Sequence, residues 1–160
     1  MGFDLYGMSK NHAQDEELIG KGAYFRESVW GWRPLWELVA EMARDTLSLE
    51  DVSEGWVNNG HLIEEDKAVV IADRLKEMID SGDLTLYIAE RQRKLDALPL
   101  EECEYCDGTG TRDDVHVKGK CNGCEGAGKT KAFVCWYSLR EQSVRDFEYF
   151  CRHSGGFEIR

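Results

Sequence analysis

Apolar side chains recur at helical spacing in four stretches of the chain. The clearest stretch covers residues 64–81, where apolar residues repeat every three or four positions and share one helix face. Glu64, Glu65 and Asp66 suit the positive end of this helix, and Gly82 suits its C-terminal end. The other three expected helices run from Trp32-Arg33-Pro34 to about Asp45, from Asp83 to about Leu98, and from the capping-box pair Ser138 and Glu141 to about His153.

Strand patterns are fewer and shorter. Phe3 and Leu5 alternate with polar or amphipathic neighbours, which predicts a strand at the start of the chain. Residues 132–137 are uniformly apolar or aromatic and predict a buried strand, whereas residues 157–160 alternate and predict a closing edge strand.

The remaining segments carry turn signals or no periodicity. Residues 7–23 and 46–63 therefore predict loops, with a turn at Asn58-Asn59-Gly60. Together the patterns predict an α+β fold with about four helices and a small antiparallel sheet. We expect a single domain over residues 1–160, with a zinc-binding knuckle inserted at residues 101–131.

Two copies of a C-x-x-C-x-G-x-G motif supply the clearest candidate chemistry. They contribute Cys103 and Cys106, then Cys121 and Cys124, with 14 residues between the two pairs. A two-residue spacing lets one tight turn present both sulfurs to an ion, and two such turns complete a tetrahedron. Glycines after each pair allow positive φ, so that backbone amides can turn toward the thiolates. The motif predicts one structural Zn²⁺ held by these four cysteines; four reduced core thiols or two disulfides are the alternatives.

The repeated motif resembles the cysteine-rich zinc module of DnaJ-type chaperones. The resemblance covers residues 103–128, and two repeats, where the chaperones have four, imply one ion. The His-Pro-Asp motif of a J-domain is missing from the sequence, so chaperone activity is not implied. The segments MGFDLYG, VWGWRPLWELV and SGGFEI are similar to an uncharacterised family of small bacterial and phage proteins with an inserted knuckle.

Composition and charge narrow the function classes. The 160 residues carry a formal net charge of −11, and the longest basic cluster is Arg91-Gln92-Arg93-Lys94. Nonspecific nucleic-acid binding rests on basic groups that release counterions, so direct nucleic-acid contact is not expected. The sequence contains neither a long apolar span nor a signal-peptide pattern, which predicts a cytoplasmic protein that does not enter the membrane.

Four tryptophans, Trp30, Trp32, Trp36 and Trp56, fall close together in the sequence. Core packing accounts for most of them, although exposed aromatic side chains also anchor protein interfaces.

Other candidate residues have simpler explanations. Cys135 and Cys151 lie in apolar surroundings and predict buried thiols. His61 precedes three acidic residues that a helix N-terminus explains without a metal. His116 lies between the cysteine pairs in a predicted hairpin, where four cysteines already complete a zinc site.

These observations predict a non-catalytic zinc-binding protein that acts by binding another protein. The expected contact surfaces are the exposed part of the Trp30–Trp56 cluster and the knuckle tip at residues 113–120. One alternative is a phage or bacterial regulator of transcription or defence, which contacts nucleic acid or blocks a nucleic-acid-binding host protein by acidic mimicry. The other is an enzyme with an unrecognised carboxylate site.

Overall fold

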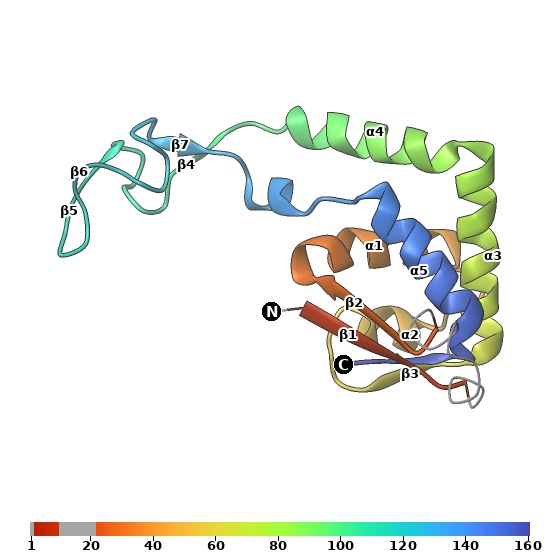
Figure 1. Cartoon of the computed structure of the whole chain (residues 1–160). Helices are drawn as coiled ribbons and strands as arrows, with labels where there is room; N and C mark the ends of the chain where they lie inside the picture. The colour runs from red at the N-terminus through yellow and green to blue at the C-terminus, as the bar shows by residue number, and fades with distance from the viewer. Residues whose placement is uncertain (1, 10–21) are drawn as a thin grey trace. The chain divides into compact units, whose positions relative to one another are not determined.

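A computed structural model describes residues 2–9 and 22–160 of the chain (Figure 1). The described residues form an α+β structure with antiparallel sheets, as the sequence predicts. Most of the loop predicted at residues 7–23 lies outside the described ranges. The helices are α1 (Val29–Met42), α2 (Leu49–Glu54), α3 (Glu65–Ser81), α4 (Asp83–Asp96), α5 (Glu141–Ser154) and the 3₁₀ turn η2 (Phe133–Trp136). The strands are β1 (Gly2–Gly7), β2 (Tyr24–Ser28), β3 (His61–Ile63), β4 (Glu101–Glu102), β5 (Thr111–Asp113), β6 (Lys118–Lys120), β7 (Lys129–Thr130) and β8 (Phe157–Ile159).

The chain divides into two compact units. Residues 1–89 and 137–160 form the first, which we call the sheet unit, and residues 90–136 form the second, which we call the knuckle unit. The boundary falls inside α4, and the knuckle unit contains the whole predicted knuckle at residues 101–131. The single domain expected over residues 1–160 stays a prediction. Removing the metal tests it, as the Discussion describes.

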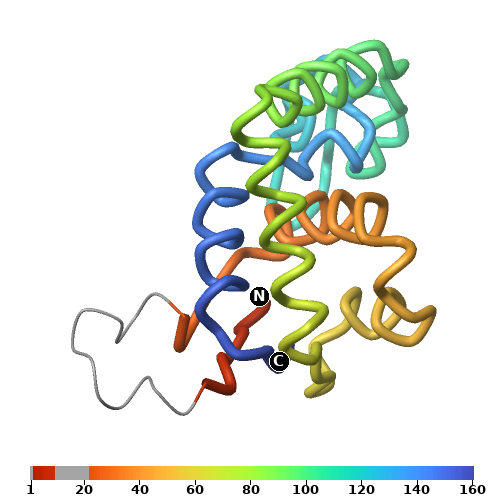
Figure 2. The backbone as a smooth tube through the Cα atoms, turned by 90° about the vertical axis from the view of Figure 1, so that its right-hand side faces the viewer, coloured from red at the N-terminus to blue at the C-terminus, as the bar shows by residue number. Residues whose placement is uncertain are grey.

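The sheet unit is built on a four-stranded antiparallel sheet in the order β2-β1-β8-β3. Leu5 of β1 lies opposite Phe25 of β2 and Ile159 of β8, so that buried side chains share one face. The C-terminal strand pairs with both β1 and β3, and the prediction of an edge strand there is therefore wrong. Helices α3 and α5 run side by side in this unit (Figure 2), and Arg152 of α5 forms an ion pair with Asp73 of α3 at 2.9 Å.

The core of the sheet unit is rich in stacked aromatic rings. Trp32 and Trp36 of α1 are fully buried, and their ring centroids lie 5.4 Å apart. Trp56 is partly buried and packs against the same core. Trp30 remains 40% exposed, with its ring 5.1 Å from that of Tyr137. The prediction of core packing is thus confirmed for most of the tryptophans, and the exposed part of the Trp30–Trp56 cluster consists of Trp30 and part of Trp56.

The helix ends match the sequence prediction at α3 and differ from it at the starts of α1 and α5. Helix α3 and its left-handed Gly82 match the prediction. Helix α1 begins before the predicted Pro34, because the Ser28 side chain accepts a hydrogen bond from the amide of Gly31. Helix α5 begins at Glu141 with Arg140 at its N-cap position, so the predicted cap at Ser138 is wrong.

Two further segments differ in secondary structure from the prediction. Residues 46–63 contain α2 and β3 in addition to loops. Residues 132–137 form no strand: Phe133–Trp136 is a 3₁₀ turn, and both Phe133 and Trp136 are exposed.

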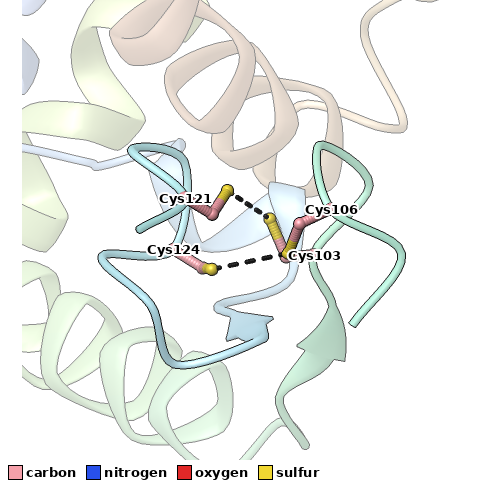
Figure 3. Close-up of side chains that lie close together, drawn as sticks. All are labelled: Cys103, Cys106, Cys121 and Cys124. Carbon is pink, nitrogen blue, oxygen red and sulfur yellow. Dashed lines mark hydrogen bonds between the residues drawn. The ribbon is translucent and has the colours of Figure 1, made fainter. Parts of the chain in front are cut away.

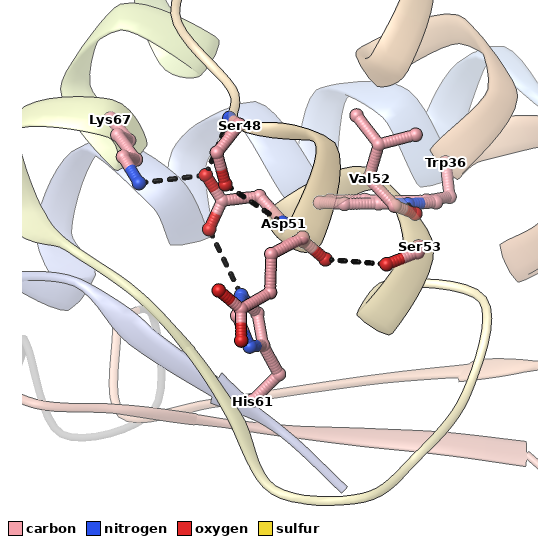
Figure 4. A network of polar contacts seen from close by, with 8 residues as sticks. Trp36, Ser48, Asp51, Val52, Ser53, His61 and Lys67 are labelled. Carbon is pink, nitrogen blue, oxygen red and sulfur yellow. Dashed lines mark hydrogen bonds and ion pairs between the residues drawn. The ribbon is translucent and has the colours of Figure 1, made fainter.

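A polar network ties α2, β3 and α3 together around Asp51 (Figure 4). The Asp51 side chain is 4% exposed, and its oxygens lie 2.9 Å from Nε2 of His61 and 2.7 Å from Nζ of Lys67. Asp51 and Ser48 also form a reciprocal capping box at the start of α2. Burial alone would raise the pKa of Asp51, but Lys67, His61 and Ser48 outweigh it and hold that pKa well below its usual range.

Replacing Asp51 by asparagine is expected to lower the free energy of unfolding by about 2–3 kcal/mol at pH 7, because Lys67 and the α2 cap lose a buried charged partner. A depressed pKa stabilises the folded state above the unfolded value of about 3.9 and ceases to do so as the pH falls toward the folded value. Urea titrations at several pH values should therefore show a smaller loss of stability between about pH 5 and pH 2.5 for the variant than for the wild type. Parallel pH profiles for the two proteins would contradict this assignment.

Candidate metal centre

The four motif cysteines come together in the knuckle unit (Figure 3). Their sulfur atoms all lie within 4.8 Å of one another, and all four residues are buried. The Sγ atoms of Cys103 and Cys121 are 3.9 Å apart, and those of Cys106 and Cys124 are 3.7 Å apart. Each of these two pairs joins one copy of the motif to the other, so both copies line the same small space.

These distances fit a tetrahedral metal ion. Bonds of about 2.3 Å between Zn²⁺ and four sulfurs give edges of about 3.8 Å between the sulfurs. The two observed distances bracket that value, whereas a disulfide would require about 2.05 Å. The cysteines are free thiols in this structure, and the group can hold one metal ion, for which zinc is the typical choice for four cysteines.

The two motifs adopt the same local structure. In each copy the last glycine donates its amide N–H to the second cysteine: Gly110 to Sγ of Cys106 and Gly128 to Sγ of Cys124, both at 3.2 Å. The four motif glycines all have positive φ, as the sequence predicts. These amides direct positive partial charge at two of the sulfurs, which offsets the negative charge that thiolates would carry.

The two copies also hold each other through the backbone. The amide of Cys103 donates to the carbonyl of Gly128, and the amide of Cys121 donates to that of Gly110, each at 2.9 Å. A Cβ atom added at Gly110 would lie 2.4 Å from the carbonyl oxygen of Gly126. Glycine is therefore required there by close approach as well as by backbone conformation.

The surroundings shift the pKa values of Cys103 and Cys124 in opposite directions. Burial raises the pKa of Cys103 to about 11. Burial also acts on Cys124, but the amide of Gly128 and the neighbouring thiols outweigh it and lower that pKa to about 7. Because four thiolates in one small space repel one another, a divalent cation is the natural partner for this group.

The other candidate ligands that the sequence offered are not part of this cysteine cluster. His116 is in the turn between β5 and β6, where its amide donates to Oδ1 of Asp114, and the candidate metal group among the described residues does not include it. His61 contacts Asp51 in the sheet unit. Cys151 is buried in α5, as predicted, whereas Cys135 is half-buried on η2 and contacts the carbonyl of Leu95.

One contact at the knuckle was not expected from the sequence. The ring of Tyr105 lies over Gly123, where an added Cβ would be 2.4 Å from the ring. Arg112 lies 5.7 Å from the centre of that ring and donates to the side chain of Asn122 at 3.0 Å. The difference between Cys-Glu-Tyr-Cys and Cys-Asn-Gly-Cys was the available signal, because the glycine leaves room for the tyrosine across the site.

Comparison with protein-family models, with curated proteins and with solved structures finds no match. The four-cysteine cluster is consistent with a zinc-knuckle-like module. The resemblances to the DnaJ-type module and to a family of small bacterial and phage proteins stay predictions from the sequence. Among the helices of the described residues, none combines the length and apolar character needed to cross a membrane.

Proposed function

We propose that the chain binds one structural zinc ion through Cys103, Cys106, Cys121 and Cys124, and that it acts by binding another protein. The sulfur geometry is the observation that supports the zinc assignment, because the two sulfur–sulfur distances of 3.9 and 3.7 Å are close to the edge of a zinc–thiolate tetrahedron. The paired amide donors at Gly110 and Gly128 support it, since they are the contacts that stabilise bound thiolates.

The role that fits this site is structural. Bound zinc would draw four thiolates into one tetrahedron and hold the two turns together. Catalytic zinc sites keep one position for water or substrate, whereas four protein ligands fill the coordination shell. In this proposal the residues around the metal orient and shield it, and turnover is not part of the function.

Binding to a protein is the activity that best fits the rest of the molecule. The net charge of −11 opposes binding to phosphate backbones, and the knuckle unit exposes aromatic side chains suited to a protein interface. A four-thiolate site also fits the reducing conditions of the cytoplasm, where we propose that the protein acts.

Metal analysis of the purified protein tests the zinc assignment. We expect one zinc per chain in the wild type, and at least a tenfold loss of zinc affinity in Cys121→Ser, because a ligand is removed from a closed shell. Cys135→Ser is the matched control, since its sulfur lies against Leu95, and it should retain one zinc. Two ions per chain, or unchanged affinity in Cys121→Ser, would refute the assignment.

A further inference from the structure

The four cysteines of the cluster differ in their access to solvent. Cys103 and Cys121, the first cysteines of the two motifs, are 0% exposed. Cys106 and Cys124, the second cysteines, remain 7% and 8% exposed. We call Cys103 and Cys121 the inner pair and Cys106 and Cys124 the outer pair. Because the oxidation of a cysteine depends on its exposure, a small oxidant that enters from solvent meets the outer pair first.

The outer pair joins one motif copy to the other. The Sγ atom of Cys106 lies 3.7 Å from that of Cys124, although the two residues are 18 positions apart in the chain. A disulfide needs an S–S distance of about 2.05 Å, so the two sulfurs would have to approach by about 1.7 Å. Backbone hydrogen bonds between the copies, such as the one from the amide of Cys121 to the carbonyl of Gly110, hold the two turns side by side during this movement.

We propose that the outer pair makes the metal site sensitive to oxidation: a peroxide joins Cys106 to Cys124 in a disulfide, and the zinc ion is released. The proposal rests on the zinc-binding function above and adds a regulation of the same site. After oxidation the inner pair is left with two thiolates, which bind zinc more weakly than a closed shell of four. Disulfides that form in a reducing compartment are usually transient, and many of them serve to sense oxidants.

The reaction balances with the peroxide as the oxidant. The thiolate of one outer cysteine attacks the O–O bond, which breaks to give a sulfenic acid on that sulfur and one hydroxide. The thiolate of the other outer cysteine then attacks this sulfur, forms the S–S bond and expels a second hydroxide. The two sulfurs lose two electrons, which the peroxide gains, and two protons from solvent convert the hydroxides to water. Zinc leaves as Zn²⁺ with its oxidation state unchanged, and the inner pair stays reduced.

Other pairings of the four cysteines compete with this one. A disulfide within either motif would resemble that of a redox-active C-x-x-C pair, and the inner pair could also join, since its sulfurs are 3.9 Å apart. Each of these alternatives includes at least one fully buried cysteine. The outer pair alone combines two partly exposed cysteines, and their sulfurs are already close together. The identity of the disulfide is therefore as specific an expectation as the loss of zinc.

Oxidation of the zinc-loaded full chain by hydrogen peroxide tests the proposal. Zinc content is measured first, and zinc release is then followed with a colorimetric chelator beside a sample without peroxide. At each time, free thiols are blocked with iodoacetamide in denaturant, and oxidised thiols are reduced and labelled with N-ethylmaleimide. Tandem mass spectrometry locates the labels, and a digest without reductant identifies the crosslinked peptides.

When half of the zinc has been released, the maleimide label on the outer pair should exceed that on the inner pair by at least about fivefold. The unreduced digest should contain Cys106 linked to Cys124. Excess dithiothreitol with added zinc should restore one zinc per chain. Cys135→Ser is the matched control, because its half-buried thiol lies against the carbonyl of Leu95, and it should release zinc at the wild-type rate through the same disulfide.

A disulfide within one motif, in the inner pair or to Cys135 at half release would overturn the proposal, and so would zinc release without any disulfide. Retention of zinc in peroxide would overturn it as well, while the zinc assignment would stand. Absence of zinc before peroxide is added would refute the zinc assignment and this proposal with it. The zinc content of the starting sample thus distinguishes the two failures.

Discussion

Replacing Trp32 by alanine is expected to lower the free energy of unfolding of the sheet unit by about 4 kcal/mol or more. The indole is fully buried, stacks on Phe3 and Trp36, and meets the edge of the Phe147 ring. Its Nε1–H donates to the carbonyl of Gly55 at 2.8 Å. In the variant this buried carbonyl would lose its hydrogen-bond donor. The variant therefore combines a large cavity with a lost buried hydrogen bond, which is a severe change for a domain of ordinary stability.

Urea denaturation followed by far-ultraviolet circular dichroism measures this loss. Trp30→Ala is the control on the same helix, because its ring is 40% exposed and contributes less buried area. We expect a loss in Trp30→Ala of less than half that in Trp32→Ala. Similar losses in the two variants would show that the assignment of Trp32 to the core and Trp30 to the surface is wrong.

Elements with a long apolar period were predictable from the sequence. Helix α3 repeats apolar residues through five turns and ends at a left-handed glycine, and both features are local. Helix α2 is only six residues long, too short for a period to show, and its capping box at Ser48 and Asp51 was the available signal.

Strand β2 escaped prediction because one of its inward positions is charged. Phe25 and Glu27 face the core side of the sheet, and a buried glutamate interrupts the expected alternation of apolar and polar residues. Glu27 accepts hydrogen bonds from Arg140 at 3.1 and 3.3 Å and from the amide of Ser28 at 2.9 Å. Arg140 is 113 positions away, so a local pattern cannot reveal the partner that makes this burial tolerable.

The buried strand predicted at residues 132–137 was wrong for a different reason: the run is apolar throughout, but it has no core to pack against. A short apolar run predicts burial only where a core is available to receive it. In the knuckle unit the buried apolar residues are the four motif cysteines and Ala132, which leaves no apolar core beside the turn. The cysteine cluster itself was predictable, because the spacing within each motif determines the local turn, and two such turns meet at one point.

Removal of the metal is expected to unfold the knuckle unit and leave the sheet unit folded. The knuckle unit has two-residue and three-residue strands and almost no buried apolar surface apart from its cysteines. Units of this size without a hydrophobic core depend on a metal or disulfides for their stability, and structural zinc contributes on the order of 10 kcal/mol in small zinc-binding peptides. The sheet unit buries a separate cluster of aromatic and aliphatic side chains, which does not include any of the four motif cysteines.

Hydrogen exchange measured by mass spectrometry, before and after a strong chelator, separates the two units. Amides of residues 101–131 should lose protection, including those of Cys103 and Cys121, whereas amides of α3 and α5 should keep theirs. Cys121→Ser should reproduce the chelated pattern without chelator, and Cys135→Ser should behave as the wild type does. Loss of protection in α3 and α5 on chelation would mean that the chain folds as one cooperative domain with the knuckle inside it. Retained protection at residues 101–131 in metal-free protein would mean that the backbone bonds between the two motifs, such as the one from Cys121 to Gly110, suffice to hold the knuckle without zinc.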